Sequence, residues 1–124
     1  MVIRSKPWHG LRWLFAIAIV PLPAWAETAD ENYRLYCVQC HGTLGNGEGI
    51  NQTSGGLAVS PRSHTYAEDM SKLTDEELRL AIADGGDAVE KSELMPSFGK
   101  TLSGQEIDEL VRHLRELCQC EADR

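Results

Sequence analysis

Two cysteines and a histidine stand together in Cys37-Val38-Gln39-Cys40-His41, and their spacing points to covalent haem chemistry. On one helical turn, thiols three positions apart face the same way, so both can bond to neighbouring vinyl groups of one porphyrin. The next residue then lies under the iron, where its imidazole can serve as an axial ligand. The pattern predicts one haem c, attached through both cysteines, with the histidine on the iron. A zinc or thioredoxin-like dithiol site is the alternative.

An iron held by His41 has one more axial position, and Met95 is predicted to fill it. Met95 lies 54 residues beyond His41 in an irregular segment, and Pro96 stiffens the backbone just after it. A thioether opposite an imidazole favours ferrous iron and raises the reduction potential, as an electron carrier would use. The alternative for Met95 is a core-filling side chain. His64 is the second candidate ligand, although a surface position or a hydrogen bond to a propionate fits it better.

Three further residues receive supporting roles. Met70 just precedes a capped helix and is expected to pack in the core, whereas His113 is expected to contact another helix. Arg62 can pair with a haem propionate because a guanidinium binds a carboxylate bidentately; an exposed arginine is the alternative. No nucleophile and base stand in a catalytic arrangement, so we do not expect an enzyme.

The first 26 residues have the layout of a secretory signal peptide. A basic start precedes an apolar run at 13–20, and a small-x-small cleavage pattern follows at Ala24-Trp25-Ala26. The run is shorter than the about 20 residues that cross a bilayer, and an uncleaved anchor is the alternative. We expect residues 1–26 to be removed and residues 27–124 to form one periplasmic domain without stable membrane insertion.

Residues 27–124 carry nine basic and nineteen acidic side chains, a formal net charge of −10. No basic stripe remains for nucleic acid, so we expect no such partner. An acidic surface fits a basic docking partner, although solubility alone explains it equally well. These 98 residues are few for a self-sufficient core. A buried porphyrin is therefore expected to supply apolar volume, and the haem-free chain to fold poorly.

Three helices are predicted, each opened by a hydroxyl residue and a glutamate three positions later that form a capping box. The boxes are Thr28/Glu31, Thr74/Glu77 and Ser103/Glu106. The first helix is expected to carry an aromatic pair and both haem cysteines on one face, at Tyr33, Tyr36, Cys37 and Cys40. The second helix ends at Gly85-Gly86. The last has an apolar stripe at Ile107, Leu110, Val111, Leu114 and Leu117.

Glycine-rich and irregular stretches separate these helices, and no segment alternates like a strand over a useful length. Residues 42–49 hold four glycines, which let the backbone approach a planar cofactor closely. Residues 50–66 are a long connection that is expected to wrap something, and residues 90–100 are again irregular. The predicted fold class is all-α: three to five short helices wrapped round one covalently bound haem.

These features resemble class I c-type cytochromes, the small single-haem proteins of the bacterial periplasm. The resemblance covers residues 30–117 and rests on Tyr33, the haem motif with Gly42, the loop 45–49, the helix 73–82 and the segment 94–99. It implies the axial pair His41 and Met95. It also implies that the first and last helices cross and that the methionine loop covers the far haem face.

The function implied by this resemblance is one-electron transfer between periplasmic redox proteins, such as a reductase, an oxidase or a dehydrogenase. One alternative is an accessory or maturation subunit of a respiratory reductase. Another is a ligand-binding or sensing haem protein, if Met95 is labile. The identity of the electron donor and acceptor does not follow from the residues.

Three departures from the family pattern stand out. Related chains often have proline where Ile50 stands, and its carbonyl orients the proximal histidine; Ile50 is expected to offer its own carbonyl from a softer backbone. The last helix often carries an aromatic at the place of His113, so its contact with Tyr33 is expected to be more polar. Cys118-Gln119-Cys120 is extra and lacks a following histidine. A strained local disulfide, a cross-link between two chains and a metal site remain open, with a structural or incidental role and a monomer favoured.

Overall fold

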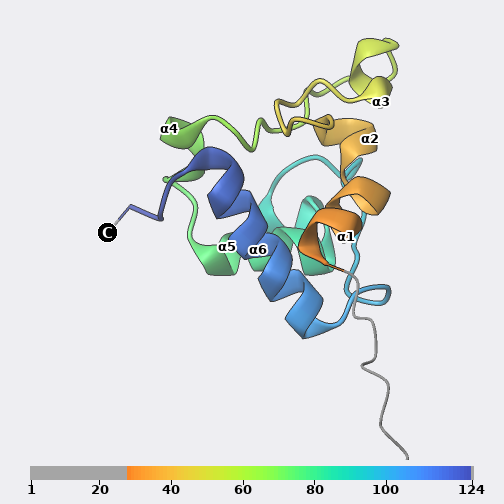
Figure 1. Cartoon of the computed structure of the whole chain (residues 1–124). Coiled ribbons are helices and arrows are strands. Elements are labelled where there is room, and N and C mark those ends of the chain that lie inside the picture. Colours follow the sequence, from red (N-terminus) through yellow and green to blue (C-terminus); the bar gives the residue numbers. More distant parts are fainter. Residues whose placement is uncertain (1–27, 124) are drawn as a thin grey trace, which may run out of the picture.

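The computed structural model describes residues 28–123, which contain six α-helices, one 3-10 turn and no strand (Figure 1). The helices are α1 (Ala29–Tyr36), α2 (Val38–His41), α3 (Ile50–Thr53), α4 (Ala67–Met70), α5 (Asp75–Asp84) and α6 (Gly104–Cys118), with η1 (Asp87–Val89) after α5. The all-α class is confirmed. The helix count exceeds three to five because α2, α3 and α4 are four-residue turns without a side-chain cap. The expected signal peptide, residues 1–26, lies outside the described residues.

The three longer helices begin where the capping boxes predict. The hydroxyls of Thr28, Thr74 and Ser103 each accept a hydrogen bond from the backbone of the glutamate three positions on, whose carboxylate accepts one from the cap residue's N–H. Such a cap stabilises a helix by ~1 kcal/mol. α5 ends at Gly85, whose φ of 90° is a left-handed conformation that suits glycine. A Cβ at Gly85 would also lie 2.9 Å from the carbonyl oxygen of Met95.

The core lies where α6 packs against α1 and α5, which Figure 1 shows on either side of it. The buried face of α6 includes the predicted stripe, apart from the half-buried Leu117. Met70 is fully buried beside this face and packs in the core, as predicted. Each such apolar side chain stabilises the fold by about 1.5–3 kcal/mol when buried. None of the helices within residues 28–123 is long and apolar enough to cross a membrane.

The expectation of one continuous helix through the haem motif is wrong, because the helix is interrupted at Cys37. Hydrogen bonds nevertheless continue across the interruption: the Cys37 N–H donates to the Tyr33 carbonyl, and the His41 N–H donates to the Cys37 carbonyl, both at 2.9 Å. Cys37 and Cys40 therefore still line one cavity.

The segment 90–100 is irregular, as predicted, but it is anchored to the end of α5. The N–H groups of Phe98 and Gly99 donate to the carbonyls of Ile82 and Ala83 at 3.0 and 2.9 Å. These carbonyls belong to the last turn of α5, which lacks partners within the helix. The irregular segment thus satisfies the end of α5 and at the same time carries Met95 to the side of that helix.

Candidate cofactor site

The predicted site residues converge on one region, although they are far apart in the sequence. A cavity of ≈ 1080 Å³ opens between the 57–64 connection, α5 and the 86–95 segment, and Cys40, His41 and Met95 line it. A smaller cavity of ≈ 60 Å³ has these three residues and Cys37 in its wall. The larger volume reaches the upper end of the ~300–1,000 Å³ typical of ligand pockets. Much of its wall is apolar: Leu57, Val59, Leu78, Leu80, Ala81, Ile82, Ala88, Val89 and Leu94.

His41 is held through one ring nitrogen. Its Nδ1–H donates to the carbonyl oxygen of Arg62 at 2.9 Å. A carbonyl can only accept, so the proton sits on Nδ1 and the lone pair of Nε2 stays free. Burial lowers the pKa of His41, while the hydrogen bond to the Arg62 backbone opposes that shift. His41 is therefore a neutral imidazole in the tautomer that a metal ligand requires.

The backbone group that orients His41 corrects the expectation for Ile50. Ile50 begins α3, its side chain is 61% exposed, and its carbonyl accepts the N–H of Ser54 at 3.0 Å. Arg62 reaches His41 because the chain returns across the glycine loop, where a Cβ on Gly47 would lie 2.7 Å from the carbonyl oxygen of Pro61. A backbone carbonyl leaves no mark in a sequence. The sequence gives one indication of the segment that orients His41: Pro61, which stands just before Arg62 and eleven positions after Ile50.

His64 is buried, which contradicts the expected surface position. The residue is only 7% exposed. Its ring stacks on that of His41, with 4.1 Å between the ring centroids and 21° between the ring planes. Because the two rings are in contact, this arrangement leaves no room for a metal ion between His41 and His64. Its Nδ1 shares a hydrogen bond of 2.9 Å with the Tyr33 hydroxyl. Burial lowers the pKa of His64 well below its usual value, and repulsion from positive charge that His41 or Arg62 can carry beside it adds to the effect, so the ring is neutral at pH 7.

Tyr33 joins three elements of the site. Its ring lies 5.1 Å from that of His113, which confirms the predicted contact between the last helix and this tyrosine. The hydroxyl is directed to His64 of the 57–64 connection, whereas the contact with His113 is between the two rings. Burial and the neighbouring Cys37 raise the pKa of Tyr33, which keeps the phenol protonated. α1, α6 and the 57–64 connection thus share one buried polar cluster behind His41.

Met95 is half-buried and packs against the core. Its backbone is fixed, since its carbonyl accepts the N–H of Gly86 at 3.0 Å. The thioether has three rotatable bonds in its side chain and lies in the wall of both cavities that His41 also lines. The structure therefore brings Met95 and His41 to one cavity.

The surroundings of Cys37 do not favour zinc or dithiol chemistry. Burial, with the neighbouring Cys40 adding to it, raises the pKa of the Cys37 thiol to about 12. Disulfide exchange uses the thiolate, which a raised pKa suppresses. Within residues 28–123, no group of three or more histidine, cysteine or acidic residues is placed to hold a metal ion.

Comparison with known proteins agrees with this site. A family model described as "Cytochrome C oxidase, cbb3-type, subunit III" matches residues 24–114. The chain belongs to this family of c-type cytochrome domains. Among solved structures, the KustC0563 c-type cytochrome is 26% identical with a TM-score of 0.58, and the match covers 73% of this chain and 98% of that one. No curated protein matches the chain.

The cytochrome domain binds a covalently attached haem c with iron, and the chemistry of its class is haem-based electron transfer. The residues present fit such a group. Two thiols, a neutral imidazole with a free nitrogen, a thioether and an apolar wall meet at one cavity. The predicted family and cofactor are thereby confirmed.

Proposed function

We propose that this cytochrome domain is a periplasmic one-electron carrier whose haem is attached through Cys37 and Cys40 and ligated by His41 and Met95. The convergence of these four residues on one cavity carries the proposal. When bound, the haem iron supplies a one-electron couple, whose potential a histidine–methionine pair raises.

The surrounding residues prepare the site for that role. The Arg62 carbonyl fixes the His41 tautomer, and the stacked His64 restricts the rotation of its ring. The apolar wall excludes water from the iron, which is a second way in which a protein tunes the potential. The Arg62 side chain also lines the cavity, where it is suited to pair with a propionate.

The rim of the cavity is suited to a redox partner with a basic surface. Val59, Leu80 and Leu94 line the cavity and are at the same time exposed. Four acidic side chains also line the larger cavity, Asp69, Glu77, Glu90 and Glu93, and they outnumber the two basic ones, Arg62 and Lys91. An apolar patch with acidic neighbours fits a partner that presents apolar residues within a basic ring, in a small and transient contact. A reductase, an oxidase or a dehydrogenase of the periplasm is the class of partner we propose.

Carbon monoxide binding to the reduced protein tests the axial pair. We expect a wild-type spectrum that carbon monoxide leaves unchanged, since Met95 occupies the sixth position. The Met95→Ala variant is expected to bind carbon monoxide readily. Rapid binding by the wild type would instead support a ligand-binding or sensing protein.

Mass spectrometry of exported protein tests the leader: a chain that begins at Glu27 is expected, and retention of residues 1–26 would contradict it.

A further inference from the structure

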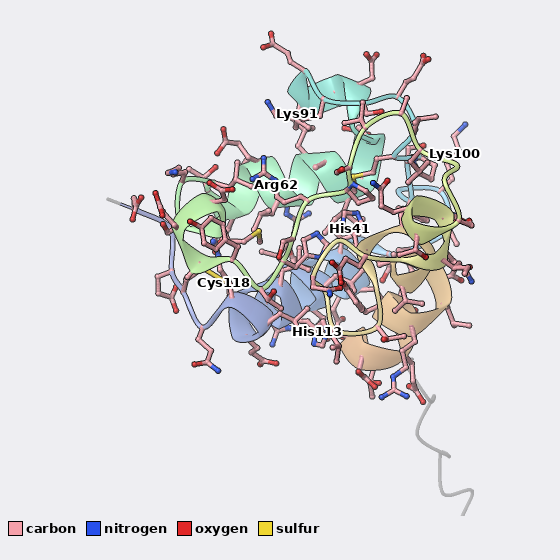
Figure 2. The ribbon with its side chains drawn as sticks, turned by 90° about the horizontal axis from the view of Figure 1, so that it is seen from above. His41, Arg62, Lys91, Lys100, His113 and Cys118 are labelled. Carbon is pink, nitrogen blue, oxygen red and sulfur yellow. A yellow bond between two sulfur atoms is a disulfide. The ribbon has the colours of Figure 1, made fainter. Side chains whose placement is uncertain are left out.

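A second sulfur pair lies away from the haem cavity. Cys118 and Cys120 form a disulfide at the end of α6, with 5.2 Å between their Cα atoms. Figure 2 shows the labelled Cys118 at the end of the blue helix, and neither residue lines either cavity of the cofactor site. The electron carrier proposed above makes no use of this pair.

Stabilisation of the fold is a poor explanation for this disulfide. A cross-link stabilises mainly by restricting the unfolded chain, and the effect grows with the number of residues enclosed. Here only Gln119 lies between the two cysteines. Gln119 also has a φ of 52°, a left-handed conformation that a non-glycine residue adopts at some strain. The disulfide therefore restricts the unfolded chain only a little. It also closes a turn in which the backbone of Gln119 is strained.

Both sulfur atoms already have partners suited to the reduced state. The Cys118 Sγ lies 3.3 Å from the carbonyl oxygen of Arg115, to which a thiol would donate a hydrogen bond. The Cys120 Sγ lies 3.9 Å from a terminal nitrogen of the Arg115 guanidinium. A guanidinium beside a sulfur favours the thiolate, which is the form that leaves and attacks in disulfide exchange.

Arg115 holds its place without help from the disulfide. It is a buried arginine on the apolar face of α6, and its guanidinium donates to the Asp75 carboxylate at 2.9 Å and to the Met70 carbonyl at 2.8 Å. The Leu73 carbonyl accepts a third hydrogen bond. Opening the disulfide breaks none of these contacts, so the charge stays beside Cys120.

The two sulfurs differ in access. Cys118 is only 5% exposed, whereas Cys120 is half-buried. An external thiolate therefore reaches Cys120 more easily, and Cys118 becomes the leaving group. The difference in exposure thus determines which sulfur is attacked and which one leaves.

We infer that Cys118 and Cys120 form a redox-active disulfide that exchanges with external thiols. The thiolate of one thiol attacks the Cys120 Sγ, a mixed disulfide forms, and the Cys118–Cys120 bond breaks. Cys118 leaves as a thiolate and takes a proton. A second external thiolate then attacks the external sulfur of the mixed disulfide and releases Cys120. The protein gains two electrons and two protons, and the two external thiols become one disulfide.

Glutathione buffers applied to the haem-loaded protein test this inference. Thiols are trapped by alkylation and counted by mass spectrometry across a series from oxidised to reduced glutathione. Haem attachment removes the Cys37 and Cys40 thiols from the count. We expect reversible reduction of the pair within the series, with the same end point reached from both directions. A pair that stays oxidised throughout, and opens only with dithiothreitol in denaturant, is structural and would overturn the inference.

Two matched variants test the roles of the two sulfurs. Cys118→Ser leaves Cys120 as the single thiol, and Cys120→Ser leaves Cys118. We expect Cys120 to form a mixed disulfide with oxidised glutathione at least on the order of tenfold faster, because it is more accessible and faces Arg115. Equal rates would contradict the assignment. An unchanged visible spectrum in both variants shows that each remains folded round its haem.

Discussion

The two proposed axial residues, His41 and Met95, have different surroundings. On the His41 side, the imidazole is hydrogen-bonded to the Arg62 carbonyl, stacked on His64 and backed by Tyr33, all of them buried or half-buried. On the other side, Met95 lies in an irregular segment whose backbone is anchored, but its neighbour Leu94 is 50% exposed.

This difference separates two tasks. A ligand fixed through its tautomer, its ring plane and a buried polar cluster cannot leave without breaking several contacts at once. Within the part of the chain that the structure describes, the thioether of Met95 makes no hydrogen bond of this kind and is held by its anchored backbone and by packing against the core. We therefore expect the His41 side to decide whether the holoprotein forms, and the Met95 side to tune its potential and its reactivity.

The largest expected contrast comes from replacing each proposed axial ligand by alanine. His41→Ala should prevent formation of a stable low-spin holoprotein, which absorbance of purified protein measures. Met95→Ala should leave a folded haem protein whose potential falls by roughly 100 mV or more, a fraction of the ~0.8 V range that axial ligands span. Redox titration measures the fall. Equal loss of holoprotein in both variants would contradict the proposed division.

A glycine substitution perturbs the Met95 side alone. Gly85→Ala places a side chain at a φ of 90° and a Cβ 2.9 Å from the Met95 carbonyl oxygen. We expect a loss of roughly 1–3 kcal/mol in the free energy of unfolding and easier carbon monoxide binding. The matched control is Gly55→Ala, where φ is also positive, at 80°, but a Cβ meets nothing within 4 Å. A similar effect at both glycines would show that the Met95 carbonyl is not involved.

A double-mutant cycle tests the cluster behind His41. Tyr33→Phe and His64→Phe each leave one buried partner of the 2.9 Å hydrogen bond unpaired, with an expected loss of about 1–3 kcal/mol in the free energy of unfolding. The double variant should lose less than the sum of the two, because no polar group is then left unpaired. Chemical denaturation of the haem-loaded proteins measures this. Strictly additive losses would argue against a shared hydrogen bond.

The smallest expected effect is a pH dependence of stability. The pKa of His64 is lowered in the folded protein, so the unfolded chain takes up a proton first as the pH falls. The contribution of neutral His64 is fully present above the unfolded pKa of about 6.5 and is lost as the pH falls through the folded pKa. Thermal unfolding between pH 7.5 and pH 5 should therefore show a decline that His64→Phe reduces. The capping glutamate Glu31, with a pKa below its usual 4.5, acts only at lower pH.

Much of the fold and the site could be read from local patterns. The capping boxes place the starts of α1, α5 and α6, and the spacing of Cys37, Cys40 and His41 predicts the cofactor that the family comparison confirms. These features are local, because each depends on residues a few positions apart. The axial role of Met95 is still a prediction, although the structure brings it to the same cavity.

The parts that escaped prediction depend on tertiary contacts. His64 gives no sign in the sequence that its ring will be buried against His41, and a carbonyl such as that of Arg62 belongs to every residue. The buried Arg115 did leave a signal, since it stands four positions after Val111 on the apolar face of the last helix. A charge on such a face predicts a paired partner, here the carboxylate of Asp75, whose own side chain is exposed.

The carbonyl that orients His41 has a consequence for how this protein tolerates change. Any residue at position 62 presents the same oxygen, so a substitution there leaves the support of His41 in place, provided that the backbone path is kept. What places the oxygen is the length of chain between the glycine loop and Pro61. An inserted or deleted residue in that connection would move the carbonyl away from His41, even in an exposed stretch of small and polar side chains. This site is therefore more vulnerable to a change of spacing than to a change of residue.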